Sequence, residues 1–190
     1  EAMNQVHSEW GRSGSRSLVL QSRDWEMMRV IYEQQFLVME QVWSYFFKDR
    51  HRRKAYERIE ELRKAGFLRL ERISVLGGRQ VIRLTSQGLK LVRADHPLDV
   101  PLVRRLDLRT LAHDEIVTSV RLRLSELWDG IWIPEKVIKQ EDYPQVPDGL
   151  FVFSSGKKVA VEIENSPKTK TRFLANLERW RRADIKLVLF

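Results

Sequence analysis

The sequence predicts an α+β protein with two modules, and three observations support this. Residues 1–97 carry 18 basic and 12 acidic side chains, whereas residues 98–190 carry 16 and 14. Such an uneven charge distribution is typical of modules with different partners. Pro97 and Pro101 disfavour helix in the residues that precede them, which indicates an extended linker. Both halves combine apolar residues at helical spacing with short runs of β-forming residues.

These signals divide the chain of 190 residues into four parts. We expect a flexible basic arm over 1–20, a first module over 21–93, a linker over 94–108 and a second module over 109–190. The last apolar run ends at Phe190 without a polar tail. The second module is therefore expected to be truncated at its C-terminus.

The composition excludes several classes of protein. The chain has no cysteine, which excludes disulfide scaffolds, cysteine-ligated zinc and iron–sulfur clusters. No apolar run approaches the ~20 residues of a membrane span, so we expect a soluble, cytoplasmic protein without membrane contact. The net charge of +8 and the pI of about 9.9 favour an anionic partner.

The first module begins with apolar residues at helical spacing. Three helices are expected, over 22–32, 38–46 and 50–65, with a break at residues 35–37. Ser22 or Asp24 would cap the first helix, and Asp49 the third. Gly66 would end the third helix, because glycine is favoured just beyond a helix C-terminus.

A hairpin and a last short helix complete this module. Residues 67–75 and 80–85 are rich in β-forming residues, and Gly77-Gly78 between them favours a tight turn. Residues 86–92 are amphipathic. Three helices followed by a hairpin is the element order of a winged helix-turn-helix.

The third predicted helix has an apolar face and a basic face. Ala55, Ile59 and Leu62 form the apolar face. The opposite face suits the major groove of DNA, where Arg and Lys contact phosphates and guanine edges. The candidate DNA-binding residues are Arg50, Arg53, Lys54 and Lys64 on this helix, Arg79 at the hairpin tip, and Arg12 and Arg16 in the arm. Two alternatives are a basic face that is only solvated and a winged helix that docks onto protein.

Acidic residues on the same helix oppose the DNA interpretation unless they are paired. Glu57, Glu60 and Glu61 would repel backbone phosphates. They are compatible with DNA binding if they face the protein, pair with Arg53 or Lys64, or contact cytosine amino groups.

The predicted element order of the second module is α-β-β-β-α-β. The expected elements are a helix over 109–127, strands over 132–139, 147–153 and 158–164, a helix over 168–182 and a strand over 185–190. Leu111, Ile116, Val120, Leu124 and Leu127 would form the apolar stripe of the first helix.

Three carboxylates gather in the predicted strands of this module. Glu162 and Glu164 share one strand face about 6.5–7 Å apart, and Asp148 opens the neighbouring strand. Carboxylates at this range raise one another's pKa unless a cation or a basic side chain compensates. Mg²⁺ suits a site of this kind, and Lys168 or Lys170 would serve as well.

The element order, Pro147-Asp148 and the Glu162-x-Glu164 strand resemble the PD-(D/E)XK nuclease superfamily. The resemblance implies an α/β restriction-endonuclease-like domain in which Asp148 and Glu162 are the strand carboxylates and Glu115 is the helix glutamate. The whole chain is similar to the replication-relaxation family of plasmid and mobile-element proteins, with His113-Asp114 as a further landmark. Glu164 stands where the superfamily has its lysine, which puts cleavage in doubt.

Two functions and a weaker alternative follow from these observations. The first is a DNA-binding protein of a plasmid or mobile element, with a degenerate nuclease-like domain. It would bind double-stranded DNA as a homodimer without a cofactor, and act in replication, mobilisation or transcription control together with replication or mobilisation proteins.

The second function is a Mg²⁺-dependent DNA endonuclease. Its catalytic residues would be Glu115, Asp148, Glu162, Lys168 and Lys170, with Asp148, Glu162 and Glu164 as metal ligands. The weaker alternative is a protein-interaction adaptor.

Overall fold

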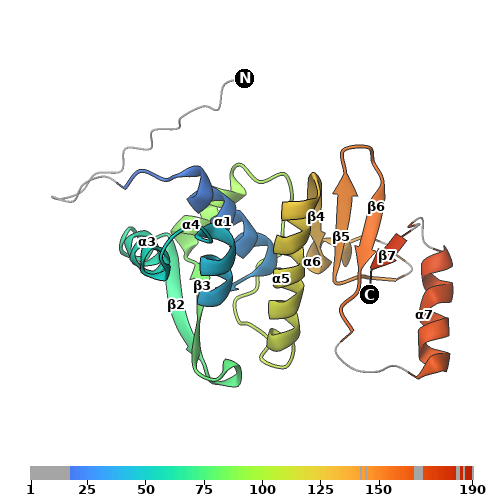
Figure 1. The fold of residues 1–190 in the computed structure, drawn as a ribbon. Coiled ribbons are helices and arrows are strands. Elements are labelled where there is room, and N and C mark those ends of the chain that lie inside the picture. The colour runs from blue at the N-terminus through green and yellow to red at the C-terminus, as the bar shows by residue number, and fades with distance from the viewer. Residues whose placement is uncertain are drawn as a thin grey trace.

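The computed structural model describes residues 18–189, apart from 142, 144, 165–168, 183–184 and 186. The fold is α+β, as the sequence predicts. It contains a three-stranded sheet in the order β1-β3-β2 and a four-stranded sheet in the order β4-β5-β6-β7 (Figure 1). Within the described residues, no helix is both long and apolar enough to cross a membrane.

Helices and a small sheet make up the first half of the fold. The elements are α1 (Ser22–Gln34), β1 (Leu37–Val38), α2 (Met39–Gln41), the π-helical turn η1 (Val42–Phe46), α3 (Arg52–Lys64), β2 (Leu68–Ile73), the 3₁₀ turn η2 (Ser74–Leu76), β3 (Arg79–Leu84) and α4 (Ser86–Arg93). Strands β2 and β3 form the predicted antiparallel hairpin. Gly77 and Gly78 both have positive φ in its turn, which explains the glycine pair.

Local details differ from the sequence predictions at three helix starts. Gln21, rather than Ser22 or Asp24, precedes α1, and its N–H donates to Asp24 at 2.8 Å. His51, rather than Asp49, caps α3, because its Nδ1 accepts the Arg53 N–H at 3.3 Å. The second helix is split into α2 and η1. Gly66, as expected, has a positive φ just after α3.

The predicted linker is packed against α1. Val100 is buried, and its N–H donates to the Tyr32 hydroxyl at 3.0 Å. His96 Nε2 lies 3.2 Å from Glu33 Oε1. These contacts hold the segment between α4 and α5 on the surface of α1, although it has an irregular backbone.

A long helix and a mixed sheet form the second half of the fold. The elements are α5 (Leu111–Leu127), β4 (Gly130–Pro134), α6 (Glu135–Ile138), β5 (Gly149–Phe153), β6 (Lys158–Val161), α7 (Lys170–Arg182) and β7 (Leu187–Leu189). Strands β4, β5 and β6 pair antiparallel, and β7 returns parallel to β6. The strand expected over 132–139 ends at Pro134 and gives way to α6. The strand expected over 158–164 ends at Val161.

Helix α5 lies between the two halves (Figure 1). Leu122 joins the core of the first half, whereas Val117 and Leu124 pack with Trp132 and Phe151 of the second sheet. The predicted stripe is therefore wrong in part. Ile116 and Leu127 are exposed, because a helix buried on two sides does not follow the pattern of a single apolar face.

Candidate nucleic-acid interface

The N-terminal end of α3 concentrates positive charge. Arg50, Arg52, Arg53 and Lys54 lie within five residues and are exposed, and the first turn of α3 contains no acidic side chain. The peptide dipoles already place partial positive charge at this end of a helix, so cations there are unfavourable for the isolated helix. The arrangement gives this end of α3 a positive charge that favours the binding of an anion.

The acidic residues of α3 are neutralised locally. Glu57 accepts hydrogen bonds from Lys54 Nζ at 2.9 Å and Arg53 Nε at 2.7 Å, and these two cations lower its pKa. Glu60 pairs with Arg63 at 2.7 Å, which lowers its pKa. Glu57 offsets part of the charge of Arg53 and Lys54, and Glu40 lies 3.5 Å from Arg52, so the four cations at the helix start still outnumber the acids beside them. Lys64 lies ten residues beyond Lys54, about 15 Å along the helix, and does not join that group.

A buried ion pair fixes the orientation of α3. Arg58 donates to the carboxylate of Asp24 in α1 from Nε at 3.1 Å and from Nη2 at 2.5 Å. Asp24 is fully buried, and its hydrogen bond raises the pKa of Arg58. Because this pair joins the middle of α3 to the start of α1, it holds the basic face of α3 outward.

Two aromatic rings lie at the surface next to these cations. Trp43 is 37% exposed and Tyr56 is 42% exposed. The Arg52 guanidinium lies 5.5 Å from the centroid of each ring and donates to the Tyr56 hydroxyl at 3.0 Å. The spacing of Arg52 and Tyr56 is a sequence signal for their contact, but no local pattern brings Trp43 to them. Exposed aromatic and arginine side chains are characteristic of interfaces.

Arg79 and Glu115 are placed differently from the sequence expectations for them. Arg79 does not extend from the hairpin tip but forms a bidentate ion pair with Glu115 of α5, with both N···O distances at 2.7 Å. Its Nε donates to the Leu76 carbonyl at 3.0 Å. The Glu115 carboxylate is thus directed to the hairpin and does not accompany Asp148 and Glu162.

Asp148 links three segments of the second half. Its Oδ1 lies 2.9 Å from His113 Nε2, and its Oδ2 accepts the Ile163 N–H at 2.6 Å. Nearby, Gln145 Nε2 donates to Glu162 Oε1 at 3.4 Å. Both Asp148 oxygens therefore hold α5 and the end of β6 against the start of β5.

The remaining carboxylates and lysines of the second half are more dispersed. Glu164 is exposed after β6, and Lys170 is exposed at the start of α7. Across the described part of the chain, no three His, Asp or Glu side chains are grouped so as to hold a metal ion. Lys168, Arg12 and Arg16 lie outside the described residues.

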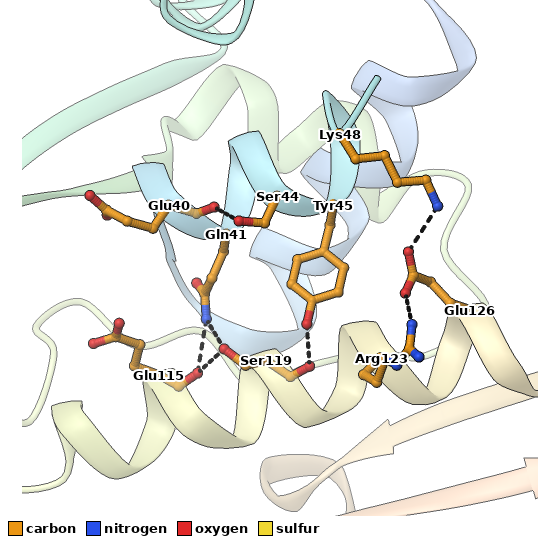
Figure 2. A pocket seen from close by; sticks show the side chains of 9 residues that line it. All are labelled: Glu40, Gln41, Ser44, Tyr45, Lys48, Glu115, Ser119, Arg123 and Glu126. Atoms are coloured by element: carbon orange, nitrogen blue, oxygen red, sulfur yellow. Dashed lines mark hydrogen bonds and ion pairs between the residues drawn. The ribbon is translucent and has the colours of Figure 1, made fainter. Parts of the chain in front are cut away.

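A polar groove of about 650 Å³ runs between η1 and α5 (Figure 2). Gln41 Nε2 donates to the Glu115 carbonyl at 2.8 Å and to Ser119 Oγ at 2.9 Å, and the Tyr45 hydroxyl donates to the Ser119 carbonyl at 3.2 Å. Lys48 and Arg123 both pair with Glu126 at the other end of the groove. Gln41, Tyr45 and Lys48 in this lining therefore join the two halves.

Comparison with known proteins gave no match: no family model, no curated protein and no solved structure is significantly similar to this chain. The functional interpretation therefore rests on the residues and their geometry.

Proposed function

We propose that the protein binds double-stranded DNA through residues 21–93, which act as a winged helix-turn-helix with α3 in the major groove. The observation that carries this proposal is the group of four exposed cations at the start of α3. In helix-turn-helix proteins, the N-terminal residues of the recognition helix contact base edges. The resemblance to the replication-relaxation family suggests a role in replication, mobilisation or transcription control of a plasmid or mobile element.

The surroundings of α3 support this function. The buried Asp24–Arg58 pair gives α3 a fixed orientation, which recognition of base edges requires. Trp43 and Tyr56 add apolar contact area beside the cations, where they would touch deoxyribose or thymine methyl groups. A protein partner of the adaptor type would have to be strongly acidic to match the same surface.

We propose that the second half has a nuclease-like fold that does not cut DNA. Three features support this proposal. Glu164 replaces the lysine that the resemblance requires, both Asp148 oxygens bind groups of the protein itself, and Glu115 pairs with Arg79. The half would then contribute packing, partner contacts or dimer contacts.

Binding of fluorescent duplexes at several salt concentrations tests the proposal. The double variant Arg53→Gln/Lys54→Gln removes two cations from α3, and Lys90→Gln/Lys157→Gln is the charge-matched control from α4 and the β5–β6 turn. Log K falls as log salt rises, and the steepness of this fall is the salt slope. Each lost phosphate contact lowers the salt slope by about 0.9. We expect the α3 variant to lower the slope by up to about 1.8 and the control to leave it unchanged. Equal behaviour of the two variants, or no salt-dependent binding by the wild type, would contradict DNA binding by α3.

Incubation with supercoiled plasmid in Mg²⁺, Mn²⁺ or chelator tests the second half. We expect no nicking by the wild type. Metal-dependent nicking that Asp148→Ala abolishes would establish the endonuclease alternative. Light scattering of the wild type measures the proposed homodimer.

A further inference from the structure

The ion pair between Arg79 and Glu115 ties the hairpin to α5. We propose that the Glu115 carboxylate acts as an intramolecular phosphate mimic, which holds Arg79 in the absence of DNA and thereby weakens DNA binding. This inference rests on the proposed DNA-binding function and adds a built-in competitor to it.

The geometry of the pair is that of a phosphate contact. The Arg79 Nη1 and Nη2 atoms lie 2.7 Å from the two Glu115 oxygens. A guanidinium presents the same pair of donors to a carboxylate and to a phosphate. A DNA phosphate would therefore replace Glu115 without any change in the donors that Arg79 uses.

One carboxylate, Glu40, acts on both Arg79 and a cation of α3. Glu40 in α2 lies 3.5 Å from Arg52, and the negative charge of Glu40 also contributes to the raised pKa of Arg79, whose main cause is Glu115. The charge of Glu40 thus acts on both arginines. A duplex that contacts both the start of α3 and the hairpin would bring a phosphate to Arg79.

The contact is separable from the packing of the two halves. Gln41 binds the backbone carbonyl of Glu115, not its carboxylate, and Figure 2 shows the Glu115 side chain directed away from that hydrogen bond. Tyr45 and Arg121 provide further links between the halves. Neutralising Glu115 would therefore release Arg79 while these links remain.

Glu115→Gln tests the inference in the duplex-binding assay. A solvent-accessible ion pair contributes up to about 1 kcal/mol, and 1.4 kcal/mol corresponds to tenfold. We expect Glu115→Gln to bind duplex up to about fivefold more tightly than the wild type. In an Arg79→Gln background the same substitution should have no effect, because the released arginine is absent.

The matched control is Glu126→Gln. It removes one negative charge from the same helix, but Glu126 pairs with Lys48 and Arg123 rather than with the hairpin. An equal gain in affinity for Glu126→Gln, or a gain for Glu115→Gln that persists without Arg79, would show a general charge effect and overturn the inference. No gain in a folded Glu115→Gln protein would overturn it as well.

The single variant Arg79→Gln tests whether Arg79 contacts DNA, without any change at Glu115. We expect it to lower the salt slope of the wild type by about 0.9, since one phosphate contact is lost. An unchanged slope would mean that Arg79 does not reach DNA, and the inference would fall while DNA binding by α3 stands. If the wild type shows no salt-dependent binding, the proposed function itself fails.

Discussion

Asp24→Asn should destabilise the protein strongly although it alters only one atom of the side chain. Asp24 is fully buried, and its two oxygens accept hydrogen bonds from Arg58 and from the Gln21 N–H. The substitution keeps the shape and creates no cavity. It removes the negative charge opposite a guanidinium that is only 11% exposed, and it turns an amide donor toward a cationic donor.

The magnitude follows from the burial of the pair. Removing one partner of a buried ion pair costs about 3–5 kcal/mol, because the other charge stays buried without compensation. Arg58 keeps its contact with Glu61 at 2.6 Å, so we expect the lower end, about 3 kcal/mol. For a chain of this length, that loss corresponds to a fall in Tm of about 6–12 °C.

Glu61→Gln is the matched control, since Glu61 pairs with the same arginine from a position that is 54% exposed. An exposed pair contributes at most about 1 kcal/mol. Urea denaturation followed by circular dichroism measures the free energy of unfolding of both variants. Equal losses for the two variants, or a loss below about 1 kcal/mol for Asp24→Asn, would refute the assignment of the stability to burial of the pair.

Two further predictions concern the second half. Burial raises the pKa of Asp114, so the folded wild type binds more protons than the unfolded chain between the ordinary carboxyl pKa of 3.8 and the raised value. The stability of the wild type therefore falls as pH rises through that window. The stability of Asp114→Asn relative to the wild type should increase as pH rises above 3.8 in urea titrations, and a difference that stays constant with pH would contradict this. In Gly149→Ala the new Cβ would overlap the Trp132 ring. Urea denaturation should therefore show a free energy of unfolding that is lower by about 1–3 kcal/mol, and unchanged stability would contradict the close packing of Trp132 on Gly149.

The elements that the sequence predicted well have local signals. Gly66 ends α3, Gly77-Gly78 turns the hairpin, and Thr85 caps α4 through a hydrogen bond from the Gly88 N–H. Each of these signals acts over four residues or fewer. Strand β1 was missed because its two residues are too few to show a period, and its pairing with β3 reaches more than 40 residues along the chain.

The same distinction between local signals and contacts over long sequence distances applies to the candidate site. The cations of α3 are visible in the sequence, because charge needs no partner to be recognised. The contacts of Arg79 with Glu115 and of His113 with Asp148 span 36 and 35 residues, and no local pattern encodes them. Glu115 is two residues beyond His113, so the two side chains project about 200° apart around α5. His113 contacts Asp148, and Glu115 contacts Arg79 of the hairpin.

Arg121 shows why the two halves influence each other. This buried side chain of α5 donates to Glu33 of α1 at 2.9 Å, and Glu33 also contacts His96. A separation of the halves would break an ion pair in which both partners are nearly inaccessible, which is costly. Helix α5 thus carries Arg121 into the first half and His113 toward Asp148 in the second. Glu115 on the same helix pairs with Arg79 at the point where the hairpin meets α5.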